Sequence, residues 1–228
     1  QLEGYKRRTE TLCSPSFHGR GYVNKGDSLA ADFIANEFRK IGLKALKKSY
    51  FQHFNLAVNT FPELVQIKLG DKKLIAGQDF LISPESGSYD NTINVKELSV
   101  DEILNESSFK TEIKAILNKK SNYNAILFNS VNVGSDTNRL VESTLFQLLD
   151  LMPIVIVTNH KFTWSVGRHQ YKFPLIELQE SAYAPNQKMY VQIDAKFIPN
   201  YQSQNVIGYL PSKKRHAKTV VVTAHYDH

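Results

Sequence analysis

The chain has 228 residues, 42% of them hydrophobic, which suits one large or two small domains with a real core and excludes a disordered chain. The formal net charge of +6 includes two dense basic runs, residues 44–48 and 213–218, which lie far apart and are not interleaved with aromatic residues. This pattern disfavours nucleic acid as a partner. No stretch approaches the ~20 apolar residues that a membrane span needs, and the single cysteine, Cys13, cannot form an intramolecular disulfide.

An amphipathic helix is predicted over residues 27–41. Apolar residues recur there at helical spacing, and Gly42 follows the last apolar turn. Asp27 or Ser28 can cap the free amides at the helix start. The members of the apolar set are Leu29, Ala30, Phe33, Ile34, Phe38 and Ile41. We expect a surface helix with one buried face.

Strands and an exposed loop are predicted next. "FQHFNLAVN" and "ELVQIKLGDKKLIAGQDF" alternate well enough to form strands, with a turn at Gly70 and Asp71. Residues 83–92, "SPESGSYDNT", are dense in turn formers and polar groups, which indicates an exposed loop.

A strand, a helix and a strand then follow in order. "NAILFN" and "PIVIVT" are short apolar runs of strand type, and the residues between them carry leucines and a valine at helical spacing. This order predicts a parallel crossover unit, to which "FPLIELQ" adds a further strand. Residues 101–120 mix helical spacing with polar breaks and give no assignment.

The last part of the chain predicts two strands joined by a polar, basic turn. They are "NVIGYL" and "TVVVTA", the second with the composition of a strand buried on both faces. The expected fold class is α/β (mixed α+β). We expect three segments: a leader with the first helix (1–57), an inserted α/β lobe (58–197) and the first strands of a second domain (198–228).

Both ends of the chain resemble the zinc-dependent aminopeptidase family whose relatives include glutamate carboxypeptidase, glutaminyl cyclase and the transferrin receptor. The similar stretches are "HGRGYVNKGDSLAADFIANEFRKIGLK" and "NVIGYL", a polar loop, then "TVVVTAHYDH". The middle, with "NAILFN", "PIVIVT" and "FPLIEL", resembles a protease-associated insert. The resemblance implies the N-terminal part of such an enzyme, truncated at the first metal-ligand motif.

His225 and Asp227 are the candidate site residues. Residues two apart in a strand face the same side. A neutral imidazole is a good zinc ligand, and a nearby carboxylate can fix its tautomer and orientation. We therefore interpret His225 as a candidate zinc ligand and Asp227 as its partner in the surrounding shell, the roles that the resemblance gives to these positions. A hydrogen-bonded strand end is the alternative interpretation of an H-x-D triplet.

The resemblance implies a zinc-activated water that releases N-terminal residues from peptide substrates. The family's other ligands and its glutamate base come from later strands and loops, so we name no catalytic residue in these 228 residues. We expect these 228 residues alone to bind no zinc tightly and to have no peptidase activity.

Two other functions remain open: a non-catalytic module whose lobe binds a peptide or protein, and a glutaminyl cyclase-like enzyme. The resemblance suggests export to the periplasm or the extracellular space. An exposed "TVVVTA" strand predicts either a dimer through that strand or its pairing with "NVIGYL" under the N-terminal helix.

Overall fold

The computed structural model describes residues 2–163, 165–185, 187–214 and 216–227. The chain forms two compact units, one of residues 1–56 and 200–228 and the other of residues 57–199. We call them unit 1 and unit 2; the expected insert was 58–197. No described helix is long and apolar enough to cross a bilayer. The mixture of helices and strands confirms the α/β fold class.

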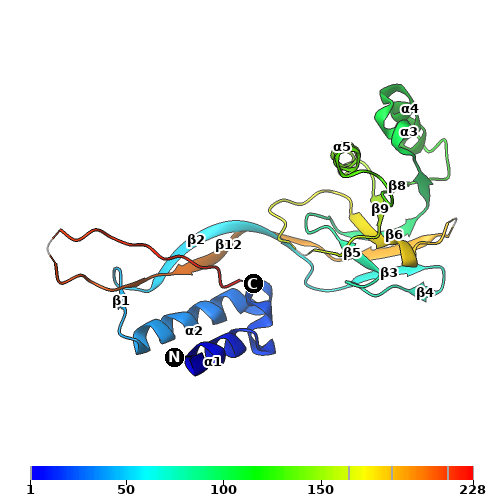
Figure 1. Ribbon diagram of the computed structural model, residues 1–228. Helices are drawn as coiled ribbons and strands as arrows, with labels where there is room; N and C mark the ends of the chain where they lie inside the picture. Colours follow the sequence, from blue (N-terminus) through cyan, green and yellow to red (C-terminus); the bar gives the residue numbers. More distant parts are fainter. Residues whose placement is uncertain (1, 164, 186, 215, 228) are drawn as a thin grey trace. The chain divides into compact units, whose positions relative to one another are not determined.

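The described residues of unit 1 form two α-helices, short 3-10 turns and strands. Its elements are α1 (Leu2–Leu12), the 3-10 turns η1 (Pro15–Arg20) and η2 (Val23–Lys25), α2 (Gly26–Lys40), β1 (Lys44–Ala45) and β13 (Gly208–Tyr209). β13 pairs with β1 in antiparallel fashion. The chain leaves unit 1 within β2 (Phe51–Thr60) and returns within β12 (Lys196–Val206), and these two strands pair (Figure 1).

Helix α2 buries a narrower stripe than its apolar pattern predicts. Ala30, Ala31 and Ala35 are at most 2% exposed, whereas Leu29 is 43% and Ile41 61% exposed.

The described residues of unit 2 form one five-stranded and one four-stranded sheet. The first has the order β5 (Phe80–Ile82), β10 (Leu175–Gln179), β9 (Ile154–Thr158), β8 (Ala125–Asn129), β7 (Val95–Glu97). The second has the order β4 (Lys72–Lys73), β3 (Val65–Leu69), β11 (Met189–Ile193), β6 (Tyr89–Ile93). The predicted parallel crossover is confirmed, because β8 pairs in parallel with β9 through α5 (Ser135–Phe146), and β9 with β10.

The five-stranded sheet of unit 2 is covered on both faces. Side chains alternate along β8, so that Ala125 and Leu127 pack toward the four-stranded sheet while Ile126 and Phe128 pack toward the helices. The helices are α3 (Val100–Leu104), α4 (Glu106–Leu117) and α5, as Figure 1 shows. Burial on both faces explains why the central strands read as continuous apolar runs.

The prediction of an exposed loop over residues 83–92 was correct only for its first part, since residues 83–88 form neither helix nor strand. Ser86 is 1% exposed, its hydroxyl accepts from the Leu175 amide at 3.1 Å, and residues from Tyr89 onward form β6. Polar groups that indicate a loop in sequence are here satisfied by the backbone of a distant strand. Residues 101–120, which gave no assignment, form most of α3 and all of α4, separated at Asn105, whose side chain caps α4.

The prediction of a buried strand at residues 219–224 was also wrong. The structure assigns no strand there, and Val220, Val221 and Val222 are 76–90% exposed. The expected pairing of residues 219–224 with "NVIGYL" does not form. The strand residues of "NVIGYL" belong to β12 and to β13, and β13 pairs with β1. A run of β-branched residues becomes a strand only with hydrogen-bonded neighbours, and no described residue supplies them.

Candidate functional site

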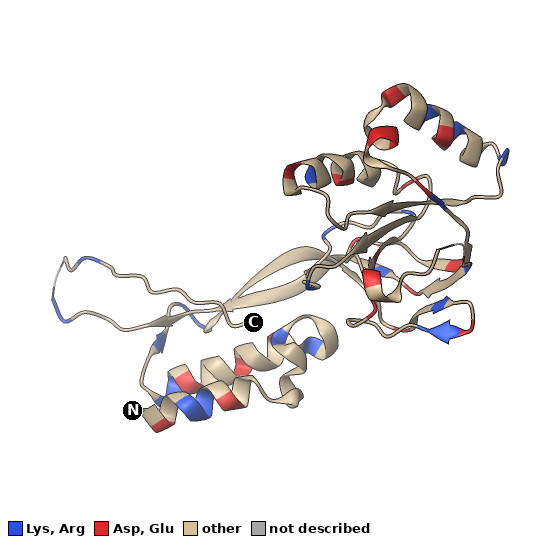
Figure 2. Cartoon of the chain, turned by 45° about the vertical axis from the view of Figure 1, so that its right-hand side comes forward, with Lys and Arg blue, Asp and Glu red and all other residues tan. Residues whose placement is uncertain are grey.

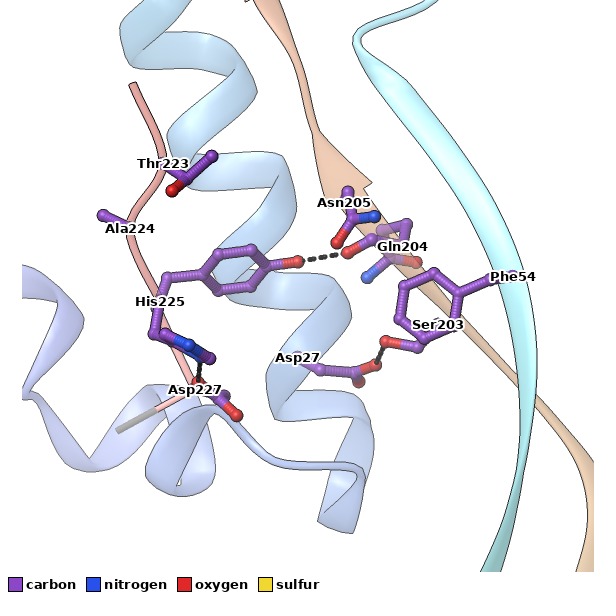
Figure 3. Close-up of a pocket in the computed structure, with 10 residues that line it drawn as sticks. Asp27, Phe54, Ser203, Gln204, Asn205, Thr223, Ala224, His225 and Asp227 are labelled. Atoms are coloured by element: carbon purple, nitrogen blue, oxygen red, sulfur yellow. Dashed lines mark hydrogen bonds and ion pairs between the residues drawn. The ribbon is translucent and has the colours of Figure 1, made fainter. Parts of the chain in front are cut away.

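A cavity of about 400 Å³ in unit 1 contains both residues of the H-x-D motif. Its walls come from the start of α2, from β2, from β12 and from the segment 223–227 (Figure 3). The lining residues are Asp27, Phe54, Ser203, Gln204, Asn205, Thr223, Ala224, His225, Tyr226 and Asp227. This volume lies within the range of about 300–1,000 Å³ that is usual for small-molecule sites.

The side chains of His225 and Asp227 are in contact at this cavity. Nδ1 of His225 lies 3.3 Å from Oδ1 of Asp227, and the two side chains are 80% and 61% exposed (Figure 3). A carboxylate beside one ring nitrogen fixes the ring's orientation and makes the other nitrogen the better electron donor. The two side chains are therefore in contact, although the strand from which we predicted their proximity does not form.

Tyr226, between them, anchors the segment. Its hydroxyl donates to the main-chain oxygen of Gln204 on β12, and its own main-chain oxygen accepts from Nε of Arg20 at 2.8 Å. Burial is the main cause that raises the pKa of Tyr226, so its hydroxyl keeps the donated proton at neutral pH. Because one residue is held from both sides, its neighbours His225 and Asp227 are held at this cavity.

Arg20 connects this anchor to the N-terminal part of the chain. Its Nη1 donates to the main-chain oxygen of Leu12 at 2.6 Å while its Nε holds Tyr226. The backbone of Arg20 has a φ of +62°, in the left-handed region that non-glycine residues rarely adopt. The hydrogen bonds to two separate carbonyl groups offset the cost of that conformation.

Asp27 lies on the opposite wall, in the first turn of α2. It is 7% exposed, and its Oδ1 and Oδ2 accept from the hydroxyls of Tyr201 and Ser203, each at 2.8 Å. Burial first, and then the bond to Asp27, raises the pKa of Tyr201 far above its ordinary value. The prediction that Asp27 or Ser28 caps the helix was wrong, because α2 begins after Lys25 without a side-chain cap, and Asp27 instead ties the helix to β12.

Gln204 forms part of the inner wall. It is 8% exposed, and its Nε2 has no hydrogen-bond partner among the described residues. A buried amide donor without an acceptor is uncommon in folded proteins.

The described residues do not form a complete metal site. Among them, no group of three or more histidine, cysteine, aspartate or glutamate side chains lies close enough to hold an ion. Zinc sites in proteins take at least three protein ligands. His225 and Asp227 form a pair of such side chains, and no third side chain of these types joins them among the described residues.

The sequence pointed to His225 and Asp227 and missed the inner part of the cavity. In "YQSQNV", Gln204 looks like an exposed position of a strand, and Tyr226 and Phe54 carry no motif. Asp27 was noted only as a helix cap. Nothing local in the sequence signals that these residues share one cavity.

No protein-family model matches the chain, and no curated protein is similar to it in sequence. Among solved structures, an aminopeptidase from Aneurinibacillus sp. strain AM-1 superposes with a TM-score of 0.46 and 17% identity. The superposition covers 80% of this chain and 42% of that chain, so this chain spans less than half of that aminopeptidase's length. A likeness at this level does not establish a family.

Proposed function

We propose that this chain is part of a zinc-dependent aminopeptidase in which His225 is one zinc ligand and Asp227 orients it. The observation that carries the proposal is the 3.3 Å contact between Nδ1 of His225 and Oδ1 of Asp227. In this proposal the ring nitrogen away from Asp227, Nε2, holds the metal, as in the carboxylate-oriented histidines of zinc sites. The sequence resemblance gives the same roles to these two positions.

The remaining ligands and the general base belong, in this proposal, to residues outside the printed sequence. Zinc in such a site supplies a bound water of lowered pKa. The part of this chain is to present the imidazole, and the anchor formed by Tyr226 and Arg20 fixes where it is presented. The exposed valines at 220–222 fit a segment that pairs with further strands, within the longer protein or in a second copy. We further propose that the substrates are peptides and that the protein acts outside the cytoplasm.

A zinc titration followed by NMR tests the role of His225 directly. Zn²⁺ is added to the chain while the Cε1–H signals of its histidines are recorded. We expect the His225 signal to move first, His225→Ala to abolish that binding, and Asp227→Asn to weaken it by about tenfold or more. His53→Ala, which removes an exposed histidine of unit 1, is the matched control. Equal effects of His53→Ala and His225→Ala would contradict the proposal.

Activity is tested on the longer protein that carries the further ligands. We expect release of the N-terminal residue from aminoacyl chromogenic substrates, and its loss in His225→Ala. A glutaminyl cyclase-like enzyme would instead convert N-terminal glutamine to a cyclic product without releasing a residue, which mass spectrometry distinguishes.

A non-catalytic binding module is the second candidate. The observation in its favour is that unit 2 buries its own core on both faces of its five-stranded sheet, independently of the H-x-D motif. Binding of a peptide library to the whole chain, with shifts confined to amides of residues 57–199 and no turnover by the longer protein, would favour this function.

A further inference from the structure

The net positive charge of the chain belongs to unit 1. Its residues 1–56 and 200–228 include 14 lysines and arginines and 6 aspartates and glutamates, whereas unit 2 has 14 and 16 of them. The formal net charges are therefore +8 for unit 1 and −2 for unit 2. Such an asymmetry between two parts of one chain is typical of a protein with an anionic partner.

Acidic and basic residues are segregated within unit 1. Apart from Asp227, its acidic residues all lie on α1 and α2. Residues 38–56 and 200–226 contain no aspartate or glutamate, and both dense basic runs, residues 44–48 and 213–218, fall in these stretches. Among the described residues, no lysine of either run forms an ion pair. The charge of the two runs is therefore available to a partner.

The pairing of β1 with β13 brings the two basic runs together. Lys44 of β1 is the register partner of Tyr209 of β13. Lys213 follows Tyr209 by four residues, so even an extended chain places it at most about 14 Å from that pair. Two runs that lie far apart in the sequence therefore form one basic surface, whose lysines are all exposed: Lys44, Lys47, Lys48, Lys213 and Lys214.

Exposed aliphatic side chains lie among the lysines of this basic surface. Leu46 stands between Lys44 and Lys47, and Leu210 directly follows Tyr209. The two leucines are 56% and 76% exposed. Nucleic-acid strands are bound through aromatic stacking on their bases, for which leucine is unsuited. A surface that combines lysines with exposed aliphatic residues is instead typical of proteins that lie on a bilayer.

We infer that the basic surface of unit 1 docks on an anionic lipid bilayer. The lysine ammonium groups bind the phosphate groups of the lipids, and Leu46 and Leu210 enter the boundary between headgroups and acyl chains. Tyr209, which is exposed beside Lys44, suits the same boundary because its ring is apolar and its hydroxyl polar. The inference goes beyond the proposed function, because it uses neither His225 nor residues outside this sequence.

Co-sedimentation with vesicles tests this docking. The whole chain, with a metal chelator present, is mixed with vesicles of equal parts phosphatidylcholine and phosphatidylglycerol or of phosphatidylcholine alone, and the bound fraction is measured. We expect saturable binding to the anionic vesicles, which weakens as added salt screens the charges, and no binding to phosphatidylcholine alone. A duplex oligonucleotide is the second probe, since it presents phosphate groups without an apolar layer.

Two variants separate the charges from the aliphatic residues. The triple variant Lys44→Gln, Lys47→Gln, Lys48→Gln should weaken binding on the order of a hundredfold, because each lysine near an anionic surface contributes about fivefold. Leu210→Gln leaves the charge unchanged and should weaken binding to the anionic vesicles about tenfold. An unchanged circular dichroism spectrum shows that each variant is folded.

The matched control removes the same charge from unit 2. Lys72, Lys73 and Lys188 are exposed lysines of that unit, and replacing all three by glutamine should leave vesicle binding unchanged. An equal loss in this control would mean that net charge alone governs binding, which would overturn the inference.

Other results would also overturn it. They are no binding to the anionic vesicles, equal binding to phosphatidylcholine alone, or full binding by folded Leu210→Gln. Tighter binding of the oligonucleotide than of the anionic vesicles would assign the basic surface to a nucleic acid instead. Because the chelator removes metal, none of these outcomes bears on the role of His225.

Discussion

Glu37 joins three cations in unit 1, and its replacement by glutamine tests how much that cluster stabilises the unit. Acidic and basic residues both lie along α1 and α2 (Figure 2). The Glu37 side chain is 6% exposed and lies 2.6 Å from Nε of Arg8, 2.8 Å from Nζ of Lys40 and 3.2 Å from Nη2 of Arg7. Two of these partners come from α1, so the cluster ties α1 to α2.

The loss of stability expected for Glu37→Gln depends on how exposed its three cationic partners are. The three cations are 40–64% exposed, so they return to water when the carboxylate is removed. The loss is therefore smaller than for a pair buried on both sides, and nearer the sum of three surface pairs at about 0.2–1 kcal/mol each. We expect Glu37→Gln to lower the free energy of unfolding of unit 1 by ~1–2 kcal/mol.

The pH dependence gives an independent check. The hydrogen bonds from Lys40 and then Arg8 lower the pKa of Glu37 below its ordinary value of 4.5. A lowered carboxyl pKa contributes stability that is present above the ordinary value and is lost as the pH falls through the lowered one. The difference between the wild type and Glu37→Gln should therefore disappear in acid.

Urea unfolding, followed by circular dichroism at neutral pH and in steps into acid, measures this difference. Glu106→Gln is the matched control, since Glu106 forms an exposed pair with Lys110 and should show no measurable change. A loss that is the same at every pH, or an equal loss in the control, would refute the reasoning.

Three further changes test other parts of the structure. Burial, and then the charge of Glu142, raises the pKa of Glu177 above its ordinary value of 4.5. The stability of the folded chain therefore falls as the pH rises from 4.5 through the raised pKa. Glu177→Gln should raise the melting temperature at neutral pH and not in acid. A Cβ on Gly26 would lie 2.3 Å from the Phe17 carbonyl oxygen, so Gly26→Ala should cost ~1–3 kcal/mol in urea unfolding. Gly134→Ala, where a Cβ has no neighbour within 4 Å, is its control. Tyr226→Phe removes the hydrogen bond to Gln204 and should lower the free energy of unfolding by ~1 kcal/mol. Hydrogen exchange over residues 223–227 should become faster. Unchanged exchange would show that Tyr226 does not anchor this segment.

Local patterns were enough for the centre of unit 2. β8, α5 and β9 follow from short apolar runs and helical spacing, because strands covered on both faces must be apolar throughout and the helix between them apolar on one side. The position of β11 between β3 and β6 could not be predicted from the sequence, because Val191 pairs with Ile67 and Asn91, which lie far from it along the chain. The turn formers of residues 83–92 predicted the loop at residues 83–88 but not the burial of Ser86, because its partner is the distant Leu175 backbone.

In unit 1 the sequence by itself determined that His225 and Asp227 lie within reach of each other, because two residues separated by one position are always near neighbours. Only the tertiary structure decided what surrounds them. The hydroxyl of Tyr201 donates to Asp27 across 174 positions, and the hydroxyl of Tyr226 donates to the main-chain oxygen of Gln204 across 22, so that no periodicity encodes the cavity. The same holds for residues 219–224, whose β-branched composition favours a strand but whose state depends on backbone partners that composition cannot supply.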